Sequence, residues 1–219
     1  MSRGGTGWDG DLTRARLVES AEELFAERGV DSVSIREVNR HAGLAPSAVH
    51  YHFGSKQALL GAVIARLGAQ LDDAIAVEAT TLLDRAASPT SRELVDLVAN
   101  PLVAAMAADP VRAPRWLKIV STLTWRDSSR IWPEVREMQV WLLSRAYPDV
   151  PDADRLLRFA IAFATLTQVL AMAPAGDATA GDRYVRACLD FVVTGLDGAM
   201  AACSESPATR HPADGRVAG

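Results

Sequence analysis

Residues 34–56 read SIREVNRHAGLAPSAVHYHFGSK, and this stretch decides the fold of the N-terminal part of the chain. Ser34 can cap a first helix, Gly43 supplies a turn, and Pro46 begins a shorter second helix that ends near Phe53. The buried stripe of the first helix consists of Ile35, Val38 and Ala42. Two helices joined by a short glycine-containing turn match a DNA-binding helix-turn-helix, but the spacing fits a structural helical corner equally well.

The second of these helices exposes more hydrogen-bonding and aromatic side chains than a soluble protein needs on its surface. Val49 and Phe53 lie four residues apart and face inward. The side chains left largely outward are those of Ser47, Ala48, His50, Tyr51 and His52. Such side chains suit the major groove of DNA, which favours the helix-turn-helix over the structural corner. His52 can equally be a packing residue that hydrogen-bonds within the bundle, whereas we expect a functional role for His50.

The rest of the chain has helical periodicity, with Pro and Gly at the boundaries and no alternating stretch typical of a strand, so we predict an all-α protein. One helix is predicted over Asp11–Arg28, and Ser55 can cap a long helix that leaves the N-terminal bundle. Further helices are predicted at Ser91–Ala108, Val111–Thr124, Ser129–Tyr147, Asp152–Ala173 and Gly181–Ala202. The predicted order is a disordered N-terminus (1–10), a three-helix helix-turn-helix domain (11–56), a helical ligand-binding and dimerisation domain (57–203) and a disordered tail (204–219).

The composition describes a soluble globular protein whose attraction for DNA is local. The chain has 219 residues, of which 49% are hydrophobic and 23% charged, and its net charge is −4. A negative chain cannot bind nucleic acid by bulk charge. Within residues 34–56, however, three cations (Arg36, Arg40 and Lys56) face Glu37 alone, which leaves a local surplus of positive charge. Because the sequence contains neither a run of about 18 apolar residues nor an apolar signal segment, we expect a cytoplasmic protein that does not enter the membrane.

An enzyme is the rival from another functional class, and the sequence offers little for it. We find no glycine-rich phosphate loop, no HExxH and no GxSxG. Three of the four histidines lie in residues 34–56. Cys188 and Cys203 lack the paired spacing of a metal site and are read as reduced, structural thiols. We therefore expect no catalytic residues, no metal and no cofactor.

A family resemblance is carried by IREVNRHAGLAPSAVHYHFGSKQALL, residues 35–60, which resembles the N-terminal helix-turn-helix of the TetR family of bacterial transcriptional regulators. The matching features are the turn at Ala42-Gly43 with Leu44, the aromatic run Tyr51-His52-Phe53, and Ser55-Lys56 at the start of the next helix. The upstream segment ARLVESAEELFAERGVDSVSIREV, residues 15–38, follows in the matching order. Together these features cover about residues 13–65, and the remainder fits the family only in being helical and of suitable length.

The resemblance implies a role for each residue of the segment. The positions at which the family meets DNA phosphates are Ser34, Arg36, Arg40 and Lys56. The positions on and before the recognition helix, which complete the expected DNA-binding set, are Ala45, Pro46, Ser47, Ala48, His50, Tyr51 and His52. Of these, Ser47, His50 and Tyr51 are placed to meet base edges or flanking phosphates, and the Ala48 methyl group suits thymine methyl groups.

Two positions depart from the family pattern. Ala45 stands where the family usually has a Ser or Thr that caps the recognition helix, a loss of about 1 kcal/mol of local stability that Pro46 can partly offset. Asn39 stands where a small apolar residue is usual, so its side chain either hydrogen-bonds a backbone group or faces partly outward.

The second half of the chain is rich in aromatic residues that can line a pocket for a partly apolar small molecule. The candidate ligand-binding residues are Trp116, Trp125, Trp132, Met138, Trp141, Phe159 and Phe163. Polar groups to orient such a ligand could come from Thr122, Gln139, Thr165 or Gln168. The alternative is that these aromatic side chains only form core or interface.

Two apolar stripes near the C-terminus predict a four-helix interface between two copies of the chain, an arrangement that the resemblance also implies. The candidate interface residues are Leu156, Ala160, Ala164, Leu189, Val192 and Leu196. A two-fold dimer would read a palindromic operator in double-stranded DNA. The leading hypothesis is therefore a dimeric repressor released from its operator by a partly apolar effector. The alternative is a DNA-binding regulator without a small-molecule ligand.

Overall fold

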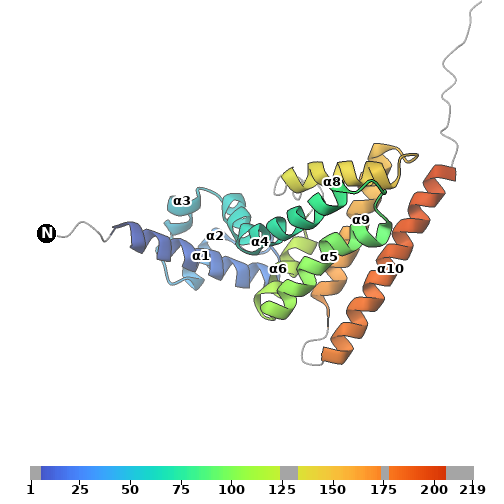
Figure 1. Ribbon diagram of the computed structural model, residues 1–219. Helices are drawn as coiled ribbons and strands as arrows, with labels where there is room; N and C mark the ends of the chain where they lie inside the picture. Colours follow the sequence, from blue (N-terminus) through green and yellow to red (C-terminus); the bar gives the residue numbers. More distant parts are fainter. Residues whose placement is uncertain (1–5, 124–132, 174–177, 206–219) are drawn as a thin grey trace, which may run out of the picture.

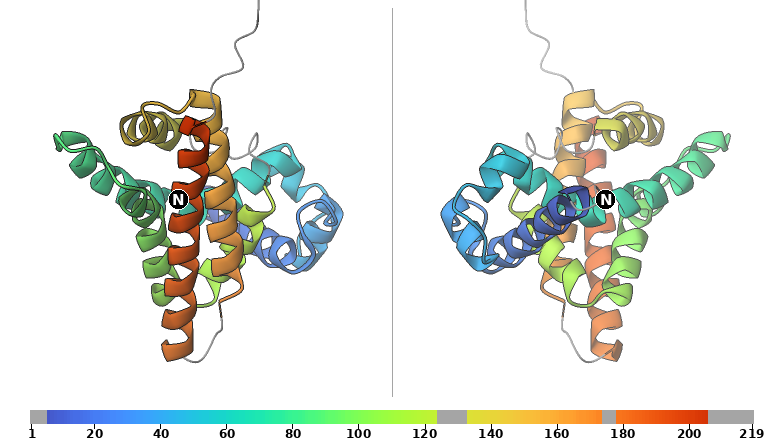
Figure 2. Two further views of the ribbon diagram at one scale, coloured as in Figure 1. Left: turned by 90° about the vertical axis from the view of Figure 1, so that its right-hand side faces the viewer. Right: turned by 90° about the vertical axis from the view of Figure 1, so that its left-hand side faces the viewer.

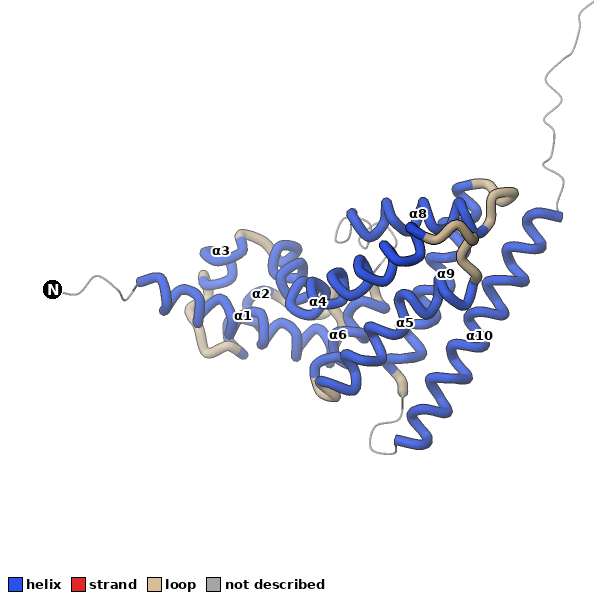
Figure 3. Tube along the Cα trace, viewed as in Figure 1, coloured by secondary structure: helices blue, strands red, loops and turns tan. Residues whose placement is uncertain are grey.

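The computed structural model describes residues 6–123, 133–173 and 178–205, and within these ranges every regular element is an α-helix (Figure 1, Figure 3). The all-α prediction is confirmed for this part of the chain. A small N-terminal bundle lies at one end, and the long helix α10 runs along the opposite side (Figure 1).

The N-terminal bundle consists of α1 (Thr6–Arg28), α2 (Ile35–His41) and α3 (Ala48–Phe53). Its core contains Leu17, Ala21 and Phe25 of α1 together with Val38 and Val49. The predicted boundaries were wrong at two places. Helix α1 begins at Thr6, so residues 6–10 are helical rather than disordered, and α3 begins at Ala48 rather than at Pro46.

Local interactions explain where α2 begins and ends. The Ser34 hydroxyl accepts a hydrogen bond from the Glu37 backbone N–H, and the Glu37 carboxylate accepts one from the Ser34 backbone N–H, which is a capping box. Gly43 follows the helix with a φ of +65°, a conformation that side chains rarely adopt. The Arg16 guanidinium of α1 donates to the Ala42 carbonyl at 2.6 Å and so ties this turn to α1.

Helix α4 (Lys56–Asp84) leads from the bundle into the second half of the molecule. The Ser55 hydroxyl caps it by accepting from the Ala58 backbone N–H at 3.1 Å, as the sequence predicts. Leu59, Val63 and Ile64 form the most deeply buried part of its apolar face. One continuous helix therefore belongs to both halves of the chain.

The second half contains α5 (Ser91–Ala108), α6 (Arg112–Ser121), α8 (Pro133–Ala146), α9 (Asp152–Ala171) and α10 (Ala178–Glu205). The predicted bounds of α5 agree with the structure, and those of the other helices differ by a few residues. Helix α10 extends to Glu205, so residues 204 and 205 are helical, and the rest of the predicted tail lies outside the described residues. Figure 2 shows α9 and α10 side by side on the face turned away from the N-terminal bundle.

Helix α6 joins the two halves by packing against both α1 and α4. The Trp116 side chain is 3% exposed, and its Nε1–H donates to the Ile64 carbonyl of α4 at 2.9 Å. Ion pairs link α6 to α1, with Arg115 3.1 Å from Glu23 and Arg112 3.6 Å from Glu22. The N-terminal bundle is thus fixed to the second half by both apolar and charged contacts.

Glu22 lies at the centre of this junction with only 4% of its surface exposed. A second guanidinium, that of Arg66 on α4, lies 3.4 Å from its carboxylate. Burial raises the pKa of Glu22, and the charges of Arg66 and Arg112 partly offset that effect.

No helix within the described ranges combines the length and the apolar character needed to cross a lipid bilayer.

Candidate nucleic-acid interface

Helix α3 presents a polar and aromatic face outward and an apolar face inward. Val49 is fully buried, and Phe53 is half-buried beneath the Arg14 guanidinium, 4.8 Å from its ring centre. Tyr51 is 86% exposed, and His50 is exposed beside it. An aromatic side chain so fully exposed contributes almost nothing to the core, so its position is better explained by contact with another molecule.

The predicted outward residues differ in how much surface they present. Ser47 is exposed like His50 and Tyr51, whereas Ala48 and His52 are half-buried. The His52 ring meets the Tyr51 ring edge to face, with centroids 5.0 Å apart and planes at 88°. His52 therefore supports the Tyr51 ring from one side, which is closer to the packing role than to base contact.

An open hollow of about 800 Å³ lies where the N-terminal ends of α2, α3 and α4 come together. The predicted DNA-binding residues that line it are Ser34, Arg36, Pro46, Ser47, His50 and Lys56. Asp31 is the acidic residue among the lining residues. Residues separated by more than twenty positions in the sequence therefore form one surface with two cations and several hydroxyl and imidazole groups. Of the predicted set, Arg40 and Ala45 are exposed but do not line this hollow.

The one acidic residue of residues 34–56 is occupied within the protein. The Glu37 carboxylate accepts hydrogen bonds from the Ser34 backbone N–H and hydroxyl, and these bonds lower the pKa of Glu37. The Arg28 guanidinium lies 3.5 Å from it. Because this negative charge is compensated locally, the exposed guanidinium groups of Arg36 and Arg40 remain available to phosphate groups.

Asn39 resolves the alternatives left open by the sequence, because its side chain is 1% exposed and bonds to backbone groups of the recognition helix. Its amide nitrogen donates to the Pro46 carbonyl at 2.6 Å, and its amide oxygen accepts from the Val49 N–H at 3.1 Å. Both polar groups of this buried amide therefore have partners on the segment that leads into α3.

Asn39 also offsets the missing cap at Ala45. In a regular helix capped at position 45, the carbonyl of that residue would accept from the N–H four positions on, that of Val49. Here the Ala45 carbonyl accepts from Ala48 at 3.0 Å instead, and the Asn39 oxygen takes the Val49 N–H. In the observed helix, which begins at Ala48, the N-cap residue Ser47 makes no side-chain cap bond. Val49 is the second residue of that helix, and its N–H is one that an N-cap side chain usually accepts, so Asn39 performs this capping role from α2.

Comparison with known proteins shows which family the N-terminal part of the chain resembles. A family model described as bacterial regulatory proteins, tetR family, matches residues 17–63. HTH-type transcriptional regulator BetI of Rhizobium meliloti (strain 1021) is 32% identical over 111 residues, which are 50% of this chain and 51% of BetI. HTH-type transcriptional repressor Rv3405c of Mycobacterium tuberculosis (strain ATCC 25618 / H37Rv) is 36% identical over 87 residues, 37% of this chain and 46% of the relative. The N-terminal part of the chain is therefore similar to regulators of the TetR family. The chain spans about half the length of these curated relatives.

Solved structures of TetR-family proteins share the fold beyond the N-terminal bundle. SmeT, the repressor of the Stenotrophomonas maltophilia multidrug efflux pump SmeDEF, superimposes with a TM-score of 0.55 at 20% identity, covering 85% of this chain and 91% of SmeT. A TetR family transcription regulator from Marinobacter aquaeolei VT8 gives a TM-score of 0.55 at 16% identity, covering 87% of this chain and 98% of that one. The helical second half therefore shares the fold of these two solved proteins. The curated relatives BetI and Rv3405c are transcriptional regulators.

The tryptophans predicted to bind a ligand do not gather in one pocket among the described residues. Trp116 is a core side chain at the junction of α4 and α6. Trp141 is 49% exposed, with the Arg145 guanidinium 4.9 Å from its ring centre. Trp125 and Trp132 lie outside the described residues.

The other ligand candidates lie near a small internal space between α5, α9 and α10. Phe159 and Phe163 line a cavity of about 10 Å³, which is room for about one water molecule. Met138 is half-buried against the core. The hydroxyl groups of Thr122 and Thr165 donate to carbonyls of their own helix turns, whereas Gln139 is half-buried and Gln168 exposed.

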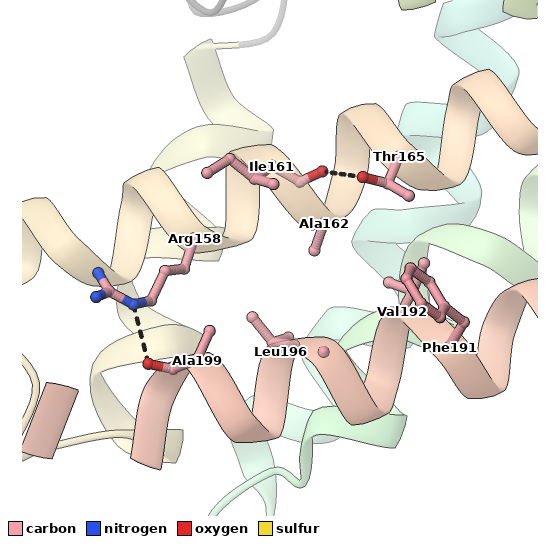
Figure 4. A pocket seen from close by; sticks show the side chains of 9 residues that line it. Arg158, Ile161, Ala162, Thr165, Phe191, Val192, Leu196 and Ala199 are labelled. Atoms are coloured by element: carbon pink, nitrogen blue, oxygen red, sulfur yellow. Dashed lines mark hydrogen bonds between the residues drawn. The ribbon is translucent and has the colours of Figure 1, made fainter. Parts of the chain in front are cut away.

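The α9 and α10 helices form an apolar groove on their outer face (Figure 4). Ile161 and Phe191, which line it, are 58% and 71% exposed, and Leu157 on α9 is 57% exposed. Of the predicted interface residues, Val192 and Leu196 line this groove. The exposure of the predicted set varies. Ala164 is exposed, Leu156, Ala160 and Leu189 are half-buried, and Val192 and Leu196 are buried.

The predicted interface residues therefore lie on the two helices that form the groove. Val192 and Leu196 are 4% and 2% exposed, so they form the floor of the groove and belong mainly to the core of the single chain. Leu157, Ile161 and Phe191 are more exposed and are not among the predicted interface residues. The signal that could have found them is the i, i+4 spacing of Leu157 and Ile161, which defines a second apolar line beside the buried stripe.

Proposed function

We propose that this chain is a sequence-specific DNA-binding transcriptional regulator that acts as a homodimer on a palindromic operator in double-stranded DNA. In the leading form of the proposal it is a repressor, and a partly apolar small molecule releases it. The recognition helix is α3, and the residues that contact DNA are those predicted from the sequence. Rv3405c and SmeT are both repressors, which supports this direction of regulation.

The observation that carries the proposal is the outer surface of α3 beside the cationic hollow. Tyr51, 86% exposed, projects from α3, and Arg36 and Lys56 lie in the hollow at its N-terminal end. Cations at the edge of a recognition helix fix its orientation on the phosphates, while side chains on its face contact the bases. On a chain with net charge −4, this local arrangement provides the attraction that bulk charge cannot.

A second copy of the chain is the proposed occupant of the apolar groove on α9 and α10. The exposed side chains of Ile161 and Phe191 line it together with Ala162 (Figure 4). Gly195 also lines it, and the small size of Ala162 and Gly195 allows helices of a partner to approach closely. Pairing the two helices with their copies gives a four-helix interface. It would cover Leu157, Ile161 and Phe191 and set two recognition helices roughly 34 to 36 Å apart, the spacing of successive major grooves.

The junction around α6 supports a coupling between the second half and the recognition helix. Trp116 joins α6 to α4, and the ion pairs of Arg112 and Arg115 join α6 to α1. A ligand that favours a different position of α6 would move the whole N-terminal bundle and thereby change the separation of the two recognition helices. The ligand would lower the affinity of the protein for its operator by the difference between the ligand's own affinities for the two positions of the bundle.

The test is selection of bound sequences from a random duplex library by the purified chain at a stated salt concentration. Enrichment of a palindromic motif is the expected result and would also provide the probe for ligand screening. Absence of any enriched sequence from a folded dimer would reject the proposal.

A regulator without a small-molecule ligand is the second candidate, and the positions of the aromatic residues favour it. Trp116 is a core residue, Trp141 is on the surface, and the cavity beside Phe159 and Phe163 has a volume of only about 10 Å³. Thermal stabilisation measured across a library of partly apolar compounds distinguishes the two. Compounds that raise the melting temperature and lower affinity for the selected operator support the leading form, and their absence supports the second.

A further inference from the structure

His50 is held in one orientation by a bond to the end of its own helix. Its Nδ1 atom lies 3.1 Å from the carbonyl oxygen of Gly54, four residues along the chain. A carbonyl oxygen can only accept a hydrogen bond, so Nδ1 carries the proton in this contact. Gly54 has a φ of +74°, which ends α3 and is a conformation that favours glycine. The backbone turn thus selects one tautomer of the imidazole.

Fixing the proton on Nδ1 determines what the other ring nitrogen can do. In a neutral imidazole with a proton on Nδ1, the Nε2 atom is an acceptor only. His50 is exposed and lines the hollow beside α3, so Nε2 is on the side of the ring that is free to meet DNA. The charged groups that line the same hollow are Asp31 before α2, Arg36 on α2 and Lys56 on α4.

An acceptor has few possible partners on DNA. Phosphate oxygens, guanine N7 and O6, and thymine O4 are all acceptors, whereas the exocyclic amino groups of adenine and cytosine are donors in the major groove. The hydroxyl groups of Ser47 and Tyr51 on the same face both donate and accept, so they impose no such restriction.

We propose that His50 is a specificity-determining residue of the recognition helix, which reads an adenine or a cytosine by accepting a hydrogen bond at Nε2 while Gly54 holds Nδ1–H. The inference rests on the proposed DNA-binding function and adds a base class to it. A single hydrogen bond of this kind gives adenine or cytosine a preference of about 2- to 10-fold over guanine or thymine at one position of each half-site.

The experiment compares the motifs selected from a random duplex library by the wild-type chain and by His50→Asn at pH 8. The asparagine amide can still donate to the Gly54 carbonyl, but it has no atom in the place of Nε2. The expected result is that one position per half-site prefers adenine or cytosine with the wild-type chain and loses that preference with His50→Asn, while the other positions stay the same. The matched control is His41→Asn, an exposed histidine on α2 outside the hollow, which should leave the motif unchanged.

The outcomes separate the inference from the function on which it rests. If the wild-type chain enriches no sequence, the proposed function is rejected and the inference with it. If the wild-type chain and His50→Asn select the same motif, and His50→Asn binds all duplexes more weakly by one common factor, His50 contacts a phosphate and only the inference is rejected.

Discussion

Replacing Asn39 by alanine should loosen the recognition helix, because Asn39 is the side chain that connects α2 to the start of α3. The substitution removes the amide oxygen that accepts from the Val49 N–H at 3.1 Å. It also removes the amide nitrogen that donates to the Pro46 carbonyl at 2.6 Å. Pro46 and Val49 lie on the segment that carries the proposed DNA-contacting residues. The expected effect is therefore on stability and on specific DNA binding together.

The loss of stability depends on whether water can replace Asn39 as the hydrogen-bond partner of each backbone group. Pro46 is exposed, so its carbonyl can be hydrated at little cost, whereas Val49 is 0% exposed and its N–H is left unpaired. An unpaired buried donor costs about 1 to 3 kcal/mol. For a chain of this length, a loss of about 2 kcal/mol lowers the melting temperature by about 4 to 8 °C.

Adding a local cap should rescue the variant. With Ala45→Ser, the new hydroxyl can accept from the Ala48 N–H, which frees the carbonyl at position 45 to accept from Val49 as in a regular helix. In the Asn39→Ala background, Ala45→Ser should recover about 1 kcal/mol. In the wild-type background it should add less, because Asn39 already serves the Val49 N–H.

Chemical and thermal denaturation of the four combinations measures this coupling. The matched control is Asn100→Ala, an exposed asparagine on α5, which should change the unfolding free energy by less than about 0.5 kcal/mol. Asn39→Leu, of similar volume, separates cavity formation from hydrogen bonding and should be destabilised as well. Equal stabilisation by Ala45→Ser in both backgrounds, or an Asn39→Ala variant as stable as wild type, would refute the capping role.

Further predictions concern DNA, the dimer and pH. Tyr51→Ala should weaken binding to the selected operator by about 1 to 3 kcal/mol and leave the dimer intact, as measured by fluorescence anisotropy and sedimentation. Lys56→Ala should weaken binding to specific and non-specific duplexes about equally and reduce the salt slope by about 1. Phe191→Asp should give a folded monomer on sedimentation, because a charge would be buried in the proposed interface. The hydrogen bond from Arg85 holds the pKa of Glu93 at about 2 against its usual 4.5, so the stability advantage over Glu93→Gln should be full above pH 4.5 and vanish as pH falls towards 2.

Each of these predictions has a contrary result. Unchanged operator affinity in Tyr51→Ala would reject the assignment of α3 as recognition helix. A sequence-dependent effect of Lys56→Ala would place that side chain at a base rather than a phosphate. A Phe191→Asp dimer would place the interface elsewhere, and a stability difference for Glu93→Gln that is constant between pH 6 and 2.5 would contradict the lowered pKa.

Local signals made much of the fold predictable. The caps at Ser34 and Ser55 predict where α2 and α4 begin, and Gly43 predicts where the chain turns. Such signals act over a few residues and survive in the sequence. The start of α3 was misplaced because its first turn depends on Asn39, a residue of another helix, and no local pattern records that contact.

Apolar periodicity locates buried faces but does not say what buries them. The stripe containing Val192 and Leu196 was assigned to a partner, yet these side chains pack within the single chain, and the exposed line is that of Leu157 and Ile161. The same limit applies to Trp116, which the clustering of aromatic residues predicts as a pocket residue. In the structure its Nε1–H donates to the Ile64 carbonyl within the core, a contact that composition cannot predict. Sequence reasoning on the DNA-binding face was more informative, because exposed aromatic and cationic side chains have few structural explanations.

The central claim is that two α3 helices of one symmetric dimer read two half-sites together. The most direct measurement compares affinity for the selected palindrome, for a single half-site, and for the palindrome with about half a helical turn inserted between the half-sites. If the claim holds, the insertion lowers affinity to about that of a single half-site, because the second recognition helix then faces the wrong side of the duplex. Affinity for the interrupted palindrome equal to that for the intact one would contradict it.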